Sequence, residues 1–330
     1  MTSRDIEISV VIPVYNEGPT IAPLCDRLVA VLERITQSWE IVFIDDGSQD
    51  GTTAAIRERH AVDERIGAVT FSRNFGKEIA IAAGLDHARG RAVVIMDADL
   101  QHPPEAIATF VQRWREGYTM VYGQRTGREG EGRLKRGLTR AFYRLFDRFG
   151  ETRLPEGAGD FRLIDRKGVE VLRSLGERAR FSKGLYAWIG FKAIGVPFGV
   201  EERRYGTTKW SLRKLFRFAF DGITAFSTMP LRVWTYLGLL VSLGAIATAV
   251  FFAVRTLLFG TDLPGFPSLI VSVMFFSGIQ LMSLGIIGEY VGRIFAEVKR
   301  RPLYIVEERL GGPTEAGDAI VRDERRAPRL

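Results

Sequence analysis

Cysteine is nearly absent from this sequence, since Cys25 is the only one among 330 residues. A single thiol cannot form an internal disulfide, and no residues have the spacing of a zinc site, so neither cross-link supports the fold. Two nucleotide-binding signatures are missing as well. Tyr15-Asn16-Glu17-Gly18 stands where G-x-G-x-x-G would follow the first predicted strand, and no G-x-x-x-x-G-K-[ST] occurs. These absences disfavour a nicotinamide-type dinucleotide site and a P-loop.

Charge is lacking in two long stretches of the last third of the chain. Residues 233–254 and 263–288 contain no charged residue, and each run is long enough to cross about 30 Å of hydrocarbon as a helix. Soluble helices of this length nearly always carry a charged face, so a pair of buried core helices is the weaker alternative. The whole chain is 46% hydrophobic and 26% charged, too mixed for a disordered polymer or an all-membrane bundle. The sequence therefore predicts a two-helix transmembrane hairpin attached to a soluble part.

Positive charge flanks the predicted hairpin on both sides and sets its orientation. Arg232 precedes the first run and Arg293 follows the second, each with further basic residues nearby, whereas the connecting loop holds mainly Asp262 and two prolines. The first strand-like run, residues 6–14, begins almost at the N-terminus and lacks the pattern of a signal peptide. We therefore expect a protein of the inner membrane whose soluble part and both termini are cytoplasmic.

Basic residues alternate with leucine and phenylalanine between Ser211 and Met229, as in an amphipathic helix that lies on a membrane surface. A second interface helix is predicted over residues 290–298. Much of the net charge of +7 lies beside the hydrophobic runs, which indicates anionic lipid headgroups and disfavours nucleic acid as the partner.

The first 100 residues alternate between apolar runs and helical patterns. Strands are predicted over residues 8–12, 40–44, 67–71 and 92–96, and helices over residues 18–37, 50–59 and 77–89. Strands that alternate with helices form a doubly wound, mostly parallel sheet. The predicted fold class is therefore α/β.

Each predicted strand runs into polar residues at its carboxyl end, which is where such sheets bind ligands. The most informative of these segments is Asp97-Ala98-Asp99-Leu100-Gln101, because residues i, i+2 and i+4 after a strand tend to share a side. Two carboxylates that close repel each other unless a cation lies between them or one is protonated. Their hard oxygen atoms suit Mg²⁺ or Mn²⁺, completed by phosphate oxygens and water. The segment therefore predicts a metal-diphosphate site.

At this point the sequence resembles a known family. It is similar to the inverting family 2 glycosyltransferases of GT-A fold in three motifs, which are V-I-P-V-Y-N-E at 11–17, I-D-D-G-S-Q-D-G-T at 44–52 and M-D-A-D-L-Q-H-P-P-E at 96–105. Within that family it is similar to the polyprenyl-phosphate glycosyltransferases in three further motifs, which are F-S-R-N-F-G-K-E at 71–78, G-A-G-D-F-R-L-I-D-R at 157–166 and R-R-Y-G-T-T-K-W-S at 203–211. The resemblance covers about residues 6–305.

The resemblance implies roles for the rim residues. The nucleobase and ribose are expected at Pro13, Tyr15, Glu17 and Asp46, with Asp97 near the ribose or the metal, and the diphosphate at Lys77. The metal is expected at Asp97, Asp99 and Gln101. Asp160 matches the position that the family regards as catalytic. Its role as a base or as an orienting and electrostatic group is left open, because a phosphate monoester is already mostly a dianion at pH 7.

The acceptor implied by the resemblance is a polyprenyl (undecaprenyl) phosphate. A dianion needs cations, and the candidates are Arg125, Lys135, Arg136 and Arg204. The expected reaction moves a hexose from a nucleotide sugar to this lipid, with UDP-glucose as the default donor and GDP-mannose or a UDP-aminosugar as alternatives. A processive polysaccharide synthase is disfavoured because Q-x-x-R-W is missing, and a noncatalytic scaffold because Asp97, Asp99, Gln101 and Asp160 are intact.

The expected organisation has five parts. They are a cytoplasmic GT-A domain (1–210), an interface helix (211–229), a membrane segment (230–292, with spans near 233–254 and 266–288), a juxtamembrane segment (293–310) and a flexible tail (311–330). Small residues in both hydrophobic runs, such as Gly244 and Gly285, allow close helix packing and predict a homo-oligomer.

Overall fold

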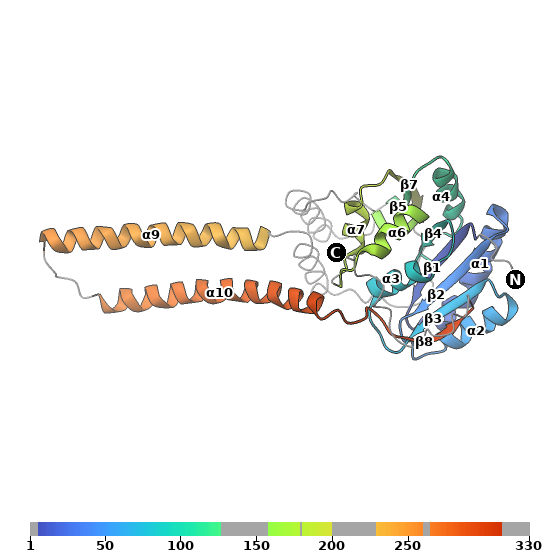
Figure 1. Cartoon of the computed structure of the whole chain (residues 1–330), viewed down its shortest axis with the longest axis horizontal. Helices are drawn as coiled ribbons and strands as arrows, with labels where there is room; N and C mark the ends of the chain where they lie inside the picture. The colour runs from blue at the N-terminus through green and yellow to red at the C-terminus, as the bar shows by residue number, and fades with distance from the viewer. Residues whose placement is uncertain (1–5, 127–157, 179, 200–228, 260–264, 312–330) are drawn as a thin grey trace, which may run out of the picture. The chain divides into compact units, whose positions relative to one another are not determined.

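The computed structural model describes residues 6–126, 158–178, 180–199, 229–259 and 265–311 (Figure 1). These residues belong to two compact units, because the chain divides after Ala219 and again after Lys299. The first unit is an α/β domain to which the chain returns at its C-terminal end. The second consists of two long helices.

The α/β unit is built on one eight-stranded sheet among the described residues, in the order β7-β5-β6-β4-β1-β2-β3-β8. The strands are β1 (Ile8–Val14), β2 (Trp39–Asp45), β3 (Ile66–Phe71), β4 (Ala92–Ile95), β5 (Met120–Thr126), β6 (Ala158–Asp165), β7 (Ala193–Gly199) and β8 (Val306–Leu310). The four predicted strands are β1 to β4, and they are parallel, as expected. The sheet as a whole is mixed, because β6 runs antiparallel to β4 and β5, and β8 runs antiparallel to β3.

Helices cover both faces of the sheet. On one face α1 (Gly18–Ile35) contacts α2 (Thr52–Val62) and α4 (Ala106–Arg115). On the other face α3 (Lys77–His87) contacts α6 (Arg166–Ser174). The short helix α7 (Ser182–Trp188) contacts β6. The three helices predicted from periodicity are confirmed as α1, α2 and α3.

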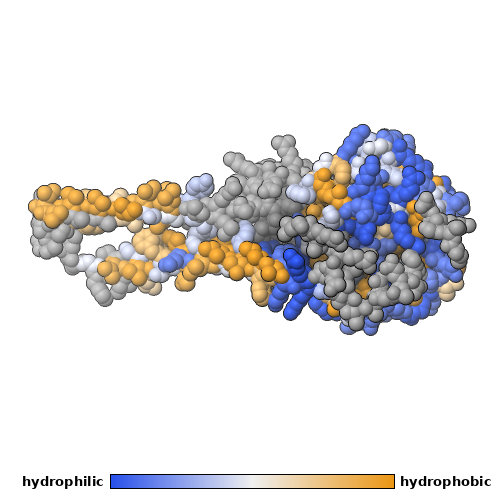
Figure 2. Space-filling view, in the orientation of Figure 1, coloured by the Kyte–Doolittle hydropathy of each residue, from blue (hydrophilic) through white to orange (hydrophobic). Residues whose placement is uncertain are grey.

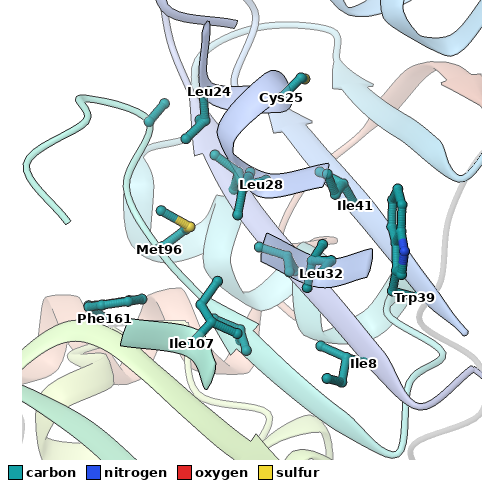
Figure 3. Close-up of a cluster of buried hydrophobic side chains, with 14 of the residues drawn as sticks. Ile8, Leu24, Cys25, Leu28, Leu32, Trp39, Ile41, Met96, Ile107 and Phe161 are labelled. Atoms are coloured by element: carbon teal, nitrogen blue, oxygen red, sulfur yellow. The ribbon is translucent and has the colours of Figure 1, made fainter. Parts of the chain in front are cut away.

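The main core lies under α1. Leu24, Leu28 and Leu32 recur at helical spacing on one side of α1 and are completely buried. They belong to one cluster with Ile8 of β1 and Ile41 of β2 (Figure 3). Burial of each such side chain contributes about 1.5–3 kcal/mol. This packing fixes the strands whose carboxyl ends carry the polar segments.

The second unit contains α9 (Met229–Phe259) and α10 (Phe266–Val298), which contact each other. Hydrophobic residues run along both helices (Figure 2), and many of their large apolar side chains are exposed. Within the described residues one stretch, Ser272–Val298, is long and apolar enough to cross a membrane, and Gly238–Phe252 of α9 is a shorter apolar stretch. Residues 290–298, for which a second interface helix was predicted, form the end of α10, which continues through them without a break.

The chain returns from α10 to the sheet of the first unit. Strand β8 pairs with β3, so that Thr70 lies opposite Glu308, and Arg57 of α2 binds the Glu308 carboxylate at 2.9 Å. Tyr304 stacks on Phe71 with the ring centroids 5.0 Å apart. Residues 293–310 were expected to form a juxtamembrane segment, and the structure adds that residues 306–310 form an edge strand of the α/β sheet.

Replacement of Tyr304 by alanine is expected to loosen β8. The change removes the stack on Phe71 and the hydrogen bond from the Tyr304 hydroxyl to Asp86 Oδ2 at 3.2 Å, worth about 1–2 kcal/mol together. Amide hydrogen exchange should become faster in β8 and β3 and stay unchanged in β1. The Tyr304→Phe variant keeps the ring stack on Phe71 and should lose only the smaller contribution, that of the hydrogen bond to Asp86. Unchanged exchange in β8 of the alanine variant would contradict this account.

Candidate functional site

The loops that follow β1 and β2 are joined by side-chain hydrogen bonds at the carboxyl rim of the sheet. The amide of Asn16 donates to Ser48 Oγ at 2.9 Å, and the amide of Gln49 donates to Asn16 Oδ1 at 2.9 Å. Asn16 itself has a φ of 55°, a left-handed conformation that asparagine tolerates better than most residues. These contacts hold Tyr15, whose exposed fraction is 39%, beside the partly buried Pro13 and Glu17.

Asp46 fixes the loop between β3 and α3. Its Oδ1 atom accepts from the amide of Phe75 at 2.6 Å and its Oδ2 atom accepts from the amide of Gly76 at 2.9 Å. Burial raises the pKa of Asp46, and the two amide donors partly oppose that rise. A Cβ atom on Gly47 would meet the backbone of Arg73 at 2.6 Å, so only glycine permits the two loops to pack this closely. Asp46 therefore positions the first residue of α3, which is Lys77.

Asp97 and Asp160 lie at the same end of the antiparallel pair of β4 and β6. Ile95 is opposite Arg162, Asp97 follows Ile95 by two residues, and Asp160 precedes Arg162 by two residues. The ammonium group of Lys77 lies between them, 2.6 Å from Asp97 Oδ1 and 2.9 Å from Asp160 Oδ2. The structure thus brings the predicted catalytic residue, one predicted metal ligand and the predicted diphosphate contact to one point.

Asp160 is largely buried, since only 14% of its side chain is exposed, and it is nevertheless ionised. Burial by itself would raise the pKa of Asp160, but the charges of Lys77, Lys183 and Arg162 outweigh burial and hold that pKa well below its usual range. The carboxylates in turn raise the pKa of Lys77 although burial opposes its charge. The Oδ1 atom of Asp160 is buried and accepts no hydrogen bond from the residues that the structure describes. One acceptor atom of Asp160 therefore lacks a partner among the described residues.

The segment after β4 has a strained backbone. Leu100 is buried and has a φ of 59°, unusual for a leucine and the kind of strain that collects at functional sites. The amide of Gln101 donates to Asp99 Oδ1 at 3.2 Å, and the amide of Asp97 donates to His102 Nδ1 at 3.4 Å. The His102 ring stacks on Phe161, the residue after Asp160, at 4.9 Å between centroids. These contacts shape the segment and connect it to β6.

The residues of this segment offer part of a divalent metal site. Carboxylate and amide oxygens suit Mg²⁺ or Mn²⁺. Among the described residues, however, no three histidine, cysteine, aspartate or glutamate side chains come together as a metal site. Two carboxylates and one amide fit a cation whose other ligands come from a bound diphosphate and water.

Several contacts of the site were missed by the sequence analysis. Arg162 is almost completely buried, with its guanidinium 3.6 Å above the Tyr186 ring, and burial lowers the pKa of Arg162. Glu78 accepts from the amide of Ser182 at 2.9 Å, which connects the start of α3 to the start of α7 and places Lys183 near Asp160. A signal existed for Arg162, His102 and Glu78, which stand inside the motifs at 157–166, 96–105 and 71–78.

The predicted acceptor residues are not assembled by the described structure. Arg125 is on β5, and nothing is described of its side chain. Lys135, Arg136 and Arg204 lie outside the described residues, as does the predicted interface helix 211–229. Their assignment stays a prediction.

Half of the sequence of this chain matches a known protein family. Residues 9–173 match the model described as glycosyl transferase family 2. The chain belongs to glycosyltransferase family 2. This family 2 glycosyltransferase is 48% identical over 306 residues to an uncharacterized glycosyltransferase of Synechocystis, and the match covers 93% of this chain and 96% of the relative.

The chain is also similar to a bactoprenol glucosyl transferase and, more distantly, to a mannosyltransferase of known structure. The chain is 42% identical over 303 residues to the SfII prophage-derived bactoprenol glucosyl transferase of Shigella flexneri, covering 92% of this chain and 98% of the relative. It is 20% identical to the mannosyltransferase PcManGT from Pyrobaculum calidifontis in complex with GDP-Man and Mn²⁺, covering 89% and 88% of the two chains with a TM-score of 0.47. No functional statement about this chain follows from so distant a structural likeness.

Proposed function

We propose that this family 2 glycosyltransferase transfers glucose from UDP-glucose to undecaprenyl phosphate at the cytoplasmic face of the membrane. The observation that carries the proposal is the 42% identity, over 92% of the chain, to a bactoprenol glucosyl transferase, bactoprenol being a polyprenol. The cluster of Lys77, Asp97 and Asp160 supports it, because it supplies paired carboxylates and a cation at the rim where α/β sheets bind ligands.

The reaction is a single displacement at the anomeric carbon. A phosphate oxygen of the acceptor attacks that carbon, the bond to the donor diphosphate breaks, and the configuration inverts. The acceptor phosphate is mostly a dianion at pH 7, so no proton has to be removed from the nucleophile. Asp160, which its cationic neighbours keep ionised, orients the sugar and stabilises positive charge that develops on its reacting carbon.

The donor is placed along the rim. Pro13, Tyr15, Glu17 and Asp46 bind or position the nucleobase and ribose, and Lys77 contacts the diphosphate. Asp97, Asp99 and Gln101 would hold Mg²⁺ or Mn²⁺, which neutralises the diphosphate as it leaves. Arg125, Lys135, Arg136 and Arg204 bind the acceptor phosphate.

The second unit is suited to cross a membrane. We propose that α9 and α10 cross the membrane as a hairpin, since their apolar side chains are exposed and soluble proteins rarely expose apolar surface of this extent. Both ends then lie on the cytoplasmic side, and the return of the chain from α10 into β8 of the proposed cytoplasmic unit supports this side for the end of α10. Small residues such as Gly244 and Gly285 would allow close packing between copies and thus support a homo-oligomer, and cross-linking in native membranes that gave monomer alone would contradict it.

A donor panel tests the function. Purified full-length protein in nanodiscs receives undecaprenyl phosphate, Mn²⁺ and one radiolabelled donor at a time: UDP-glucose, UDP-galactose, UDP-N-acetylglucosamine or GDP-mannose. Label should enter the lipid extract from UDP-glucose and not without added lipid. Preferential labelling from GDP-mannose or an aminosugar donor would change the assigned donor, and no labelling of the lipid from any of them would contradict the function.

The pH dependence of glucosyl transfer should follow the protonation of the acceptor phosphate and not that of Asp160. Because the pKa of Asp160 is lowered, this carboxylate stays charged throughout the range from pH 5 to 8. The kcat/KM for undecaprenyl phosphate should fall below about pH 6, where the acceptor gains its second proton. Slow hydrolysis of UDP-glucose by the same protein has water as its acceptor and should lack this acid limb. The same fall in rate below about pH 6 in both reactions would contradict its assignment to the acceptor phosphate.

A further inference from the structure

The ammonium group of Lys77 occupies an oxygen atom that a donor-bound metal would use. It lies 2.6 Å from Asp97 Oδ1, and Asp97 is one of the proposed metal ligands. A lysine that only contacts a diphosphate would point toward the donor and not between two carboxylates of the protein. The observed position therefore needs an account of its own.

The backbone around Lys77 is fixed, whereas its side chain is accessible. Asp46 holds the amides of Phe75 and Gly76 just before Lys77, and Glu78 just after it accepts from the amide of Ser182. The side chain of Lys77, by contrast, is 44% exposed. Movement at this point is thus limited to the flexible four-carbon side chain, which can turn from the carboxylates to another anion nearby.

We propose that Lys77 is an exchangeable counter-ion of Asp97. It pairs with Asp97 while no donor is bound. When a donor binds, Lys77 moves to the donor diphosphate and the divalent cation takes its place at Asp97. The inference rests on the proposed function and deepens it. Lys77 then makes metal binding depend on the nucleotide.

The charges explain why the exchange has this order. A divalent cation that binds alone must displace Lys77 and leave its ammonium group close to a second cation, where the two repel each other. A cation that arrives with a diphosphate supplies the anionic group to which Lys77 can move. Metal and nucleotide should therefore bind cooperatively, and coupling between two ligands typically changes affinity by about 5–150-fold.

Mn²⁺ binding to the full-length protein without nucleotide tests the proposal. Titration followed by electron paramagnetic resonance compares the wild type with Lys77→Met, which nearly keeps the length of the side chain and removes its charge. The variant should bind Mn²⁺ about tenfold more tightly than the wild type. With UDP present this advantage should disappear, because the diphosphate contact of Lys77 is lost. Equal or weaker binding of Mn²⁺ alone by the variant would overturn the proposal.

Two further variants isolate the effect of the positive charge at position 77. Lys77→Arg keeps a cation and should leave Mn²⁺ binding as weak as in the wild type, so a gain as large as that of methionine would overturn the role of charge. Lys167→Met removes an exposed lysine from α6 and should change nothing. A tenfold gain in this control would also overturn the proposal. Thermal unfolding of each variant shows that it is folded.

Glucosyl transfer by the wild type, measured in the same preparation, separates this inference from the proposed function. If the wild type transfers glucose but Lys77→Met gains no Mn²⁺ affinity, only the exchange is wrong. If the wild type transfers nothing and Lys77→Met still gains the affinity, the exchange stands and the proposed reaction fails. If no protein binds Mn²⁺ even with UDP, both the metal assignment and the exchange are wrong.

Discussion

Replacement of Asp160 by asparagine is expected to lower glucosyl transfer to undecaprenyl phosphate by about a thousandfold, the usual cost of removing a group that acts on the reacting atoms. Asparagine has nearly the same shape, so the change removes the negative charge opposite Asp97 and little else. The structure explains why the charge matters, because three cations keep Asp160 ionised in a largely buried place. The measurement is kcat with saturating donor and acceptor.

Nucleotide binding separates this role from a structural one. The Asp160→Asn variant should bind UDP with Mn²⁺ as the wild type does within a few-fold, since Asp160 is not among the proposed nucleotide contacts. The matched control is Asp26→Asn on α1, which breaks an exposed ion pair with Arg59 and should leave transfer unchanged. Near-normal kcat in Asp160→Asn would contradict the assignment of the catalytic residue.

The second large effect is expected for Asp99→Ala. Removing one of the two carboxylates of the proposed metal site should reduce metal-dependent transfer by at least about a hundredfold, because the leaving diphosphate loses its neutralising cation. Membrane insertion and folding should be retained, since the Asp99 side chain lies outside the hydrophobic core and its hydrogen bond with the amide of Gln101, at 3.2 Å, is local.

Raised Mn²⁺ serves as the diagnostic for this variant. A weakened site should recover part of its activity at Mn²⁺ concentrations well above those that saturate the wild type. The matched control is Asp63→Ala, which removes a carboxylate paired with Arg65 in the same unit, away from the proposed metal site. Transfer by Asp99→Ala at the wild-type rate would contradict the metal assignment.

Much of the α/β domain could be predicted because the relevant signals are local. Leu24, Leu28 and Leu32 repeat at helical spacing and are buried where that spacing placed them. The polar segments after β1, β2 and β4 were expected at one rim because parallel strands end on the same side. The presence of Lys77, Asp97 and Asp160 at one point was implied by the resemblance and not by any spacing.

The parts that could not be predicted depend on contacts between distant residues. β6 joins the sheet antiparallel to β4, and this pairing brings Asp160 to the end of β4 that Asp97 follows. β8 follows 33 residues of α10, and no local pattern in Val306–Leu310 indicates that its partner is β3. The bridge of Lys77 is likewise a matter of side-chain direction, which a motif does not contain.

Mass spectrometry of the lipid product tests the central claim most directly. Full-length protein in nanodiscs is incubated with UDP-glucose, Mn²⁺ and undecaprenyl phosphate, in parallel with the Asp160→Asn variant. The account predicts undecaprenyl phosphate carrying one hexosyl group from the wild type, with only traces from the variant. Wild-type protein that binds UDP with Mn²⁺ and yet leaves undecaprenyl phosphate unmodified would contradict the claim.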